Sequence, residues 1–266
     1  MQMRLLLLTI AFFSFHTSAL AEEIRPGVMR TPDSQFENLK DFDFTPNYQE
    51  IDGLRIHYVD EGPKDGQPIL MLHGQPTWGY LFRHMIKPLA NAGFRVIVPD
   101  MAGFGRSDKP IGKKDYSYLK HIKTMTALVQ HLDLEEAVFF GQDWGGLVGL
   151  RVVAEMPERF SHIVVSNTGL VAAEGIGAWL GYPLLKLAVW WEGRMTFEEM
   201  RERGNFRSWI AYAYYAENLA VGKILASLGK VSDAEVIRGY EAPFPSPVFK
   251  AGAQIFPYLI PSQLRE

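Results

Sequence analysis

The strongest chemical signal in the sequence is the hexapeptide Gly-Gln-Asp-Trp-Gly-Gly at positions 141–146. An apolar run at residues 136–140 precedes it, and a helical pattern begins at about Gly145. A strand, a tight turn and a helix in this order are typical of a nucleophile between two glycines, usually a serine. Here the middle residue is Asp143, whose carboxylate can attack carbon and form an ester. An Asp that only caps the helix is the alternative. The flanking glycines favour the nucleophile.

A second loop could stabilise the charge that hydrolysis of such an ester creates. His-Gly-Gln-Pro-Thr-Trp at positions 73–78 directly follows the apolar run at 68–72. Such a loop supplies one backbone donor, and the residue after the nucleophile supplies the other. We therefore expect the amides of Gln75 and Trp144 to form this pair, each worth about 2.7–4 kcal/mol. We interpret His73 as structural, because it precedes the glycine that shapes the loop.

The elements that must position these residues alternate along the chain between short apolar runs and helical patterns. This alternation predicts an α/β fold with a mostly parallel sheet. The predicted strands are residues 54–59, 68–72, 95–99, 136–140 and 162–165, and the predicted helices lie near 79–91, 117–132 and 145–156.

The character of the chain changes after Asn167. Residues 169–228 contain no convincing strand and are rich in Trp, Tyr, Leu and Ala. A helical insert of this kind would cover the carboxyl edge of a parallel sheet, where ligands bind. We divide the chain into a leader at 1–21, a main domain at 22–167, a cap at 168–245, and the start of a return to the main domain at 246–266.

The first 21 residues have the pattern of a secretory signal peptide. Arg4 supplies a positive charge, residues 5–15 form an apolar run, and Ala19-Leu20-Ala21 fits a cleavage site. We expect cleavage after Ala21 and a periplasmic or secreted protein with no membrane attachment afterwards. An uncleaved membrane anchor is the less favoured alternative.

Composition excludes some classes of function. The chain has 266 residues, 47% hydrophobic and 21% charged, with a net charge of −3 and no basic run, so nucleic-acid binding has no support. It has no Cys for disulfides. No group of His, Asp and Glu has metal-ligand spacing, so neither a metal nor a cofactor is implied. The 13% of aromatic residues fits either a filled core or an aromatic-walled pocket.

These motifs together resemble the haloalkane dehalogenases, which have the α/β-hydrolase fold. The resemblance rests on the loops at 73–78 and 141–146, and on Arg-Thr-Pro-Asp at 30–33 with Phe-Glu-Asn-Leu at 36–39. Tyr-Glu-Ala-Pro-Phe-Pro at 240–245, followed by Ala-Gly at 251–252 and Phe-Pro at 256–257, extends it. It runs from about Arg30 to Ser262. Epoxide hydrolases share the first two motifs in looser form.

The resemblance implies that Asp143 displaces halide from a small apolar haloalkane and that the alkyl ester is then hydrolysed. Indole N–H groups, often two, hold the leaving halide. Trp144 matches the one beside the nucleophile, and Phe-Arg-Ser-Trp at 206–209 resembles the family's cap motif, so we assign Trp209 as the second.

Other cap residues compete with or complete this assignment. Trp179, Trp190 and Trp191 are alternative halide donors, although for Trp190 and Trp191 we favour core packing. Phe244 and Pro245 are expected to line the apolar pocket.

The acid and the histidine base of the family's triad are missing downstream of the cap. The seven histidines stand at 16, 57, 73, 84, 121, 131 and 162. Some relatives keep the acid after the strand that precedes the cap, but Asn167 stands there, and the closer resemblance places the acid on a later strand. We therefore expect a chain truncated at its C-terminal end, without two strand–helix units and without turnover.

Two other functions stay open. An epoxide hydrolase would use the same Asp143 and hold the epoxide oxygen with cap tyrosines, for which Tyr212, Tyr214 and Tyr215 are available. A non-catalytic remnant that binds apolar ligands is the alternative from another class.

We interpret Asp100 and the glycine-containing loop at 103–107 as structural.

Overall fold

The computed structural model describes residues 22–169 and 175–260, except the side chains of residues 22, 175–180 and 182. The expected signal peptide at 1–21 lies outside this range. Within it, no helix is long and apolar enough to cross a membrane.

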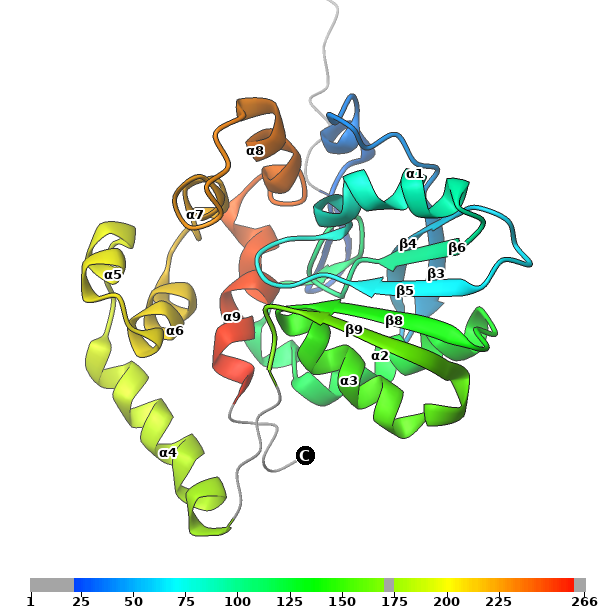
Figure 1. The fold of residues 1–266 in the computed structure, drawn as a ribbon. Coiled ribbons are helices and arrows are strands. Elements are labelled where there is room, and N and C mark those ends of the chain that lie inside the picture. Colours follow the sequence, from blue (N-terminus) through cyan, green and yellow to red (C-terminus); the bar gives the residue numbers. More distant parts are fainter. Residues whose placement is uncertain (1–21, 170–174, 261–266) are drawn as a thin grey trace, which may run out of the picture.

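A six-stranded sheet of order β3-β4-β6-β5-β8-β9 forms the centre of the molecule (Figure 1). Its parallel part is β6, β5, β8 and β9, while β3 and β4 add antiparallel strands at one edge. The predicted mostly parallel sheet is confirmed. The strands are β3 (Asn47–Ile51), β4 (Leu54–Glu61), β5 (Pro68–Leu72), β6 (Arg95–Pro99), β8 (Ala137–Gln142) and β9 (Phe160–Ser166).

Helices cover both faces of the sheet. α1 (Arg83–Asn91) lies over one face, and α2 (Tyr118–His131) and α3 (Trp144–Glu155) lie over the other (Figure 1). The helix predicted at 79–91 is interrupted, because its first turn is the 3-10 helix η2 (Gly79–Phe82). Further short 3-10 helices of the main domain are η1 (Asp33–Phe36), η3 (Lys113–Asp115) and η4 (Pro157–Arg159).

A small sheet formed by β1 (Glu22–Arg25), β2 (Val28–Arg30) and β7 (Lys109–Pro110) was not expected from the sequence. Its strands have two to four residues, too few for an alternating pattern to be visible. Strand β3 was also missed, because its polar residues do not alternate clearly with apolar ones.

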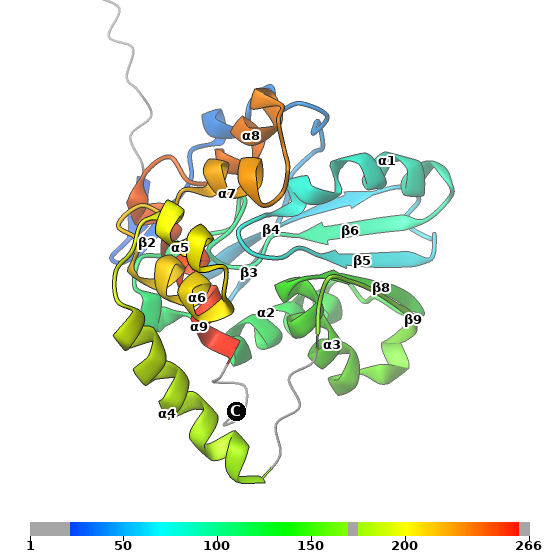
Figure 2. The ribbon, with the colours of Figure 1, turned by 60° about the vertical axis from the view of Figure 1, so that its left-hand side comes forward.

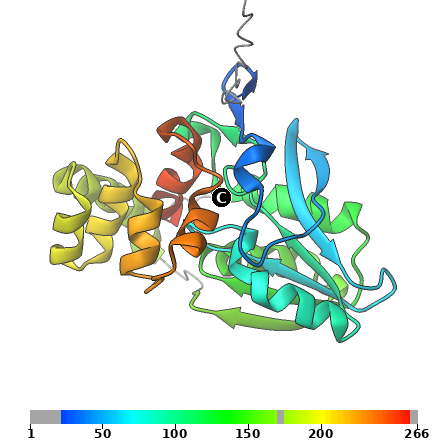
Figure 3. The same cartoon turned by 90° about the horizontal axis from the view of Figure 1, so that it is seen from above.

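The insert after Asn167 is helical, as predicted. It forms a separate layer beyond one end of the sheet (Figures 1 and 3). Residues 247–259 then run back between this cap and the sheet (Figure 2). The cap helices are α4 (Gly175–Glu192), α5 (Phe197–Arg203), α6 (Phe206–Tyr215), α7 (Val221–Ser227) and α8 (Ala234–Glu241), followed by η5 (Pro247–Lys250) and α9 (Ala251–Leu259).

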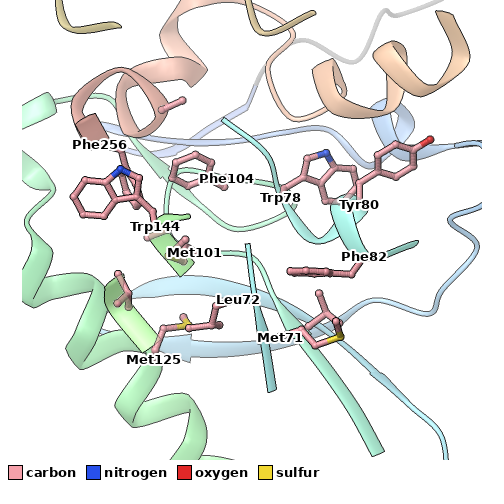
Figure 4. Packing of buried hydrophobic residues seen from close by; sticks show 14 of the residues in the cluster. Met71, Leu72, Trp78, Tyr80, Phe82, Met101, Phe104, Met125, Trp144 and Phe256 are labelled. Atoms are coloured by element: carbon pink, nitrogen blue, oxygen red, sulfur yellow. The ribbon is translucent and has the colours of Figure 1, made fainter. Parts of the chain in front are cut away.

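The strand register brings two loops together at the cap end of the sheet. Leu72, at the end of β5, pairs with Gly141 of β8, and Gln142 pairs with Ser166 of β9. The loop after β5 therefore lies directly beside the turn after β8. Large buried side chains fill the space around them, with Trp144 against Phe256 of α9 (Figure 4).

The far edge of the sheet differs from its centre. Ile163, Val164 and Val165 of β9 are 51%, 45% and 51% exposed, although the apolar run is typical of a buried strand. Among the described strands, β9 pairs only with β8, which leaves its other edge uncovered.

Candidate active site

Asp143 lies on a tight turn between β8 and α3, and its predicted position is confirmed. Its backbone has φ 52° and ψ −124°, a conformation that costs an L-residue about 1–3 kcal/mol. Surrounding bonds hold it there. The Asp143 amide donates to the Ser166 carbonyl at 3.3 Å, and the Asp143 carbonyl accepts from the Gly146 amide at 3.0 Å and the Thr168 hydroxyl at 2.7 Å.

Two glycines allow the backbones at this turn to approach closely. A Cβ at Gly74 would lie 2.4 Å from the Cβ of Asp143, and one at Gly145 would lie 2.0 Å from the Leu72 carbonyl oxygen. Both distances are far below van der Waals contact. Any side chain at either position would push the loop after β5 away from the nucleophile turn.

The amides of Gln75 and Trp144 converge on the Asp143 carboxylate. The Gln75 N–H donates to Oδ1 at 2.9 Å, and the Trp144 N–H is the second backbone donor. Burial raises the pKa of Asp143, while these two hydrogen bonds act in the opposite direction. The two donors already lie where charge would develop on the carbonyl oxygen of an ester.

A cavity of about 310 Å³ opens above Asp143. Its wall includes both assigned tryptophans, Trp144 from the turn and Trp209 from α6. The structure therefore brings these two side chains together with the Asp143 carboxylate. The rest of the lining is largely apolar and comes from the loop after β5, α3, α6, α7 and α9. It consists of Gln75, Pro76, Thr77, Leu147, Phe206, Ile224, Leu225, Leu228, Gly229, Pro257 and Ile260.

The indole N–H groups of Trp144 and Trp209 differ from that of Trp78, which is a structural residue. Trp78 Nε1 donates to the Gly239 carbonyl at 2.9 Å. No described residue accepts a hydrogen bond from the indole of Trp144 or Trp209. Since both line the cavity, their donors are available to a ligand there.

Trp190 and Trp191 of the cap are not at this cavity. We expected Trp190 and Trp191 to pack in the core, which is wrong, because they are 66% and 81% exposed. They lie on a face of α4 that carries a separate surface hollow, also lined by Leu184 and Leu187. The side chain of Trp179 lies outside the described residues.

Phe244 and Pro245 are also absent from the lining of the Asp143 cavity. The Phe244 amide bonds to the Glu241 carbonyl at 2.8 Å in the turn after α8, and its ring packs against Phe104 with 6.5 Å between centroids. Both residues instead border a different, more polar hollow beside Ser34. The structure does not bring these two residues together with Asp143.

The three cap tyrosines likewise do not line the Asp143 cavity. Tyr212 is 4% exposed, and its hydroxyl accepts a hydrogen bond from the Ala220 amide at 3.3 Å. The rings of Tyr214 and Tyr215 contact one another at 5.0 Å. None of the three lines the cavity with Asp143, so they are not placed to hold an epoxide oxygen there.

His73 joins two loops, in agreement with a structural role. Its Nδ1 lies 3.0 Å from the Gly74 carbonyl, and its Nε2 accepts from the Met101 amide at 3.1 Å. Burial lowers its pKa, although the charge of Asp100 acts in the opposite direction. Both ring nitrogens are therefore engaged within the framework of the site.

Asp100 shapes the loop after β6, as expected. Its carboxylate lies 2.7 Å from His57 Nδ1 and accepts from the amides of Gly79 and Arg106 at 2.8 Å each. Burial would raise its pKa, but the charge and hydrogen bond of His57, the charge of His73 and the Gly79 amide together lower it to about 2. Neither His57 nor any other described histidine is among the residues that line the Asp143 cavity.

Sequence reasoning missed several residues at the site. The Thr168 hydroxyl donates to the Asp143 carbonyl, and Ile224, Leu225 and Leu228 form an apolar wall. The spacing of apolar residues in α7 could have indicated that one face of this helix is buried. The local sequence pattern does not determine how the cap packs, so it could not show that this face lies toward Asp143.

Fold and site define the class: an α/β hydrolase with an aspartate at the nucleophile turn. A family model described as the alpha/beta hydrolase fold matches residues 67–200. A haloalkane dehalogenase from Mycolicibacterium paratuberculosis is 43% identical over 242 residues, 88% of this chain and 72% of that protein. One from Psychrobacter cryohalolentis is 42% identical, covering 88% and 71%.

A solved structure agrees with these relatives. The haloalkane dehalogenase DpaA from Paraglaciecola agarilytica, described as tetrameric, superposes with a TM-score of 0.72 at 33% identity, covering 88% of this chain and 71% of that one. The chain belongs to the haloalkane dehalogenase family.

Proposed function

We propose that this protein cleaves the carbon–halogen bond of small apolar haloalkanes through an ester on Asp143. One observation carries the proposal. Among the described residues that line the cavity, Asp143 is the single charged one, and the otherwise largely apolar wall includes the indoles of Trp144 and Trp209. A nucleophile and two N–H donors in an apolar space suit an alkyl halide, which leaves as an anion.

The first step needs no proton transfer. A carboxylate oxygen of Asp143 forms a bond to the sp³ carbon while the carbon–halogen bond breaks, and the halide leaves with the electron pair. The indole donors of Trp144 and Trp209 would stabilise the halide, and such bonds are stronger in a water-poor site. Asp143 therefore requires only that its carboxyl be ionised.

The second step requires a base. Water attacks the ester carbonyl, and the amides of Gln75 and Trp144 would stabilise the charge on its oxygen. The attacking water must lose a proton, and a positioned base contributes about 10²–10⁴-fold. His73, in the loop beside the Asp143 turn, has both ring nitrogens engaged elsewhere. Since no described histidine lines the Asp143 cavity, we expect the ester to accumulate.

The test is incubation of the full chain with 1-bromobutane, measuring released bromide and the mass of the protein. We expect about one bromide per chain and a butyl adduct on the peptide that contains Asp143. The Asp143→Asn variant, which keeps the shape of the side chain, should give neither product.

Three results would contradict this account. Many bromides per chain would mean that another residue acts as the base. An adduct on a different residue would mean that Asp143 is not the nucleophile. Bromoalkane binding without any bromide would favour the ligand-binding alternative.

We also propose that residues 1–21 are a secretory signal and that the mature protein begins at Glu22. The pattern of Arg4, the apolar run and Ala19-Leu20-Ala21 supports this. N-terminal sequencing of exported protein should read from Glu22, and an Ala21→Arg variant should remain unprocessed. Exported protein that still begins at Met1 would refute the proposal.

A further inference from the structure

Helix α9 lies between the nucleophile turn and the cap (Figures 2 and 3). Every residue from Ala251 to Pro257 is buried, and so is Lys250 directly before them. Two of these buried residues are polar, Lys250 at 7% and Gln254 at 6% exposed. Buried polar side chains need partners, and these two find theirs in the cap.

On one side, α9 contacts the nucleophile turn. The side-chain amide of Gln75 donates to the Ala253 carbonyl at 2.8 Å, while the backbone amide of Gln75 donates to Asp143 Oδ1 at 2.9 Å. The Phe256 ring packs edge-on against Trp144, with 4.9 Å between centroids (Figure 4). The position of α9 is thereby fixed relative to both Asp143 and Trp144.

On the other side, α9 holds the end of α6, the helix that carries Trp209. Gln254 Nε2 donates to the carbonyl of Ala216, the residue that caps α6, at 2.7 Å. Lys250 Nζ donates to the Asn218 side chain at 2.6 Å and to the Leu219 carbonyl at 2.8 Å. Carbonyls at a helix end lack partners within the helix, so the Gln254 side chain satisfies an acceptor at the end of α6.

We propose that Gln254 is a positioning residue, which sets the distance between Trp209 and Asp143 by holding the C-terminal end of α6 on α9. This role rests on the proposed function, in which Trp209 binds the halide. Trp209 lies about two helical turns from Ala216, so a shift of the helix end moves its indole within the cavity. Lys113 Nζ also bonds the Tyr214 carbonyl, so α6 keeps a second attachment when Gln254 is replaced.

The experiment is a double-mutant cycle on halide binding, using bromide quenching of tryptophan fluorescence in the full chain. Gln254→Met keeps the volume of the side chain and removes its donor. We expect the bromide Kd to rise about 3- to 10-fold, as expected for loss of one buried hydrogen bond. In a Trp209→Phe background, the same substitution should change the Kd less than about 2-fold, because the indole through which Gln254 acts is already gone.

The matched control is Gln130→Met. Gln130 is an exposed glutamine in α2, whose side-chain amide contacts the Met156 sulfur at 3.8 Å and which does not line the cavity. It should leave the bromide Kd unchanged. If Gln254→Met does not fold, Lys250→Met removes the two neighbouring bonds to the same segment and should show the same dependence on Trp209.

Two outcomes would overturn the proposal while leaving the proposed function intact. An unchanged Kd in folded Gln254→Met protein would show that the hydrogen bond does not position the indole. Equal losses with and without Trp209 would show that Gln254 acts by another route. A Trp209→Phe variant that binds bromide normally would instead overturn the halide site itself, and the role of Gln254 with it.

Discussion

The nucleophile turn and the cap wall meet at one cavity but are built in different ways. Asp143 is held by backbone hydrogen bonds to residues of adjoining elements, such as Ser166 and Gly146, and by glycines that permit close approach. Trp209 is placed by α6, whose end is held from Gln254, 38 residues further along the chain. The position of Asp143 is determined by strand register and local turn geometry. The position of Trp209 depends on contacts between side chains that are far apart in the sequence.

This difference predicts how each region responds to substitution. A turn with no free volume beside a strained residue cannot adjust, so a single added methyl group should abolish its function. A helix held by several side-chain contacts can shift by fractions of an ångström, so single losses there should weaken binding in steps.

The largest effect is expected from Gly74→Ala. The new Cβ would lie 2.4 Å from the Asp143 Cβ and 2.5 Å from Oδ1, which forces the attacking carboxylate out of its position. A displacement of about 1 Å at a reacting group costs about 10²-fold, so we expect at least that loss in the rate of ester formation. Rapid-quench measurement of bromide release gives this rate directly.

The control for Gly74→Ala is a glycine in the cap. Gly181 lies in α4, where an added Cβ meets nothing within 4 Å. Gly181→Ala should leave the rate of bromide release unchanged. Similar losses in both variants would mean that the nucleophile turn is no more constrained than the cap.

A smaller effect is expected from Trp209→Phe. A hydrogen bond to a charged group contributes about 1.5–3 kcal/mol, and each 1.4 kcal/mol is tenfold in affinity, so the bromide Kd should rise at least about 10-fold. Trp190→Phe is the matched control, because its indole is 66% exposed on α4. Fluorescence quenching by bromide measures both. Loss of quenching on replacing Trp190 alone would mean that the wrong cap tryptophan had been assigned.

The main domain could be predicted because its signals are local. Apolar runs located β5, β6, β8 and β9 to within a few residues, and the glycines around Asp143 located the turn. The loop at 73–78 could be assigned because it directly follows β5, and the parallel pairing of β5 with β8 then places it beside Asp143.

The cap could be predicted only as a helical segment. Its apolar residues face the core, the cavity or solvent, and their periodicity does not distinguish these surroundings. Trp190 and Phe206 are exposed to 66% and 56%, whereas Ile210 is fully buried, although all three are large apolar residues of cap helices. Phe244 was expected at the pocket, but the turn after α8 directs its ring against Phe104.

The smallest expected effect is on stability and concerns the carboxyl group of Asp143, which the nucleophile turn and the cap wall bury together. Burial raises its pKa, and the amides of Gln75 and Trp144 offset this only in part. An acid whose pKa is higher in the folded than in the unfolded state favours folding when protonated. Its contribution to stability is present below the unfolded pKa and is lost as the pH rises through the folded value. At neutral pH, the ionised carboxylate therefore destabilises the fold.

We accordingly expect Asp143→Asn to abolish ester formation and to raise the Tm at pH 8; each 1 kcal/mol of stabilisation corresponds to about 2–4 °C in a domain of this size. The difference in Tm between Asp143→Asn and the parent protein should narrow as the pH falls toward 4. Over the same pH range, the rate of bromide release by the parent protein should fall. The exposed Asp65→Asn should leave the Tm unchanged throughout. A stabilisation by Asp143→Asn that is constant with pH would show that it arises from the shape of the side chain and not from the buried charge.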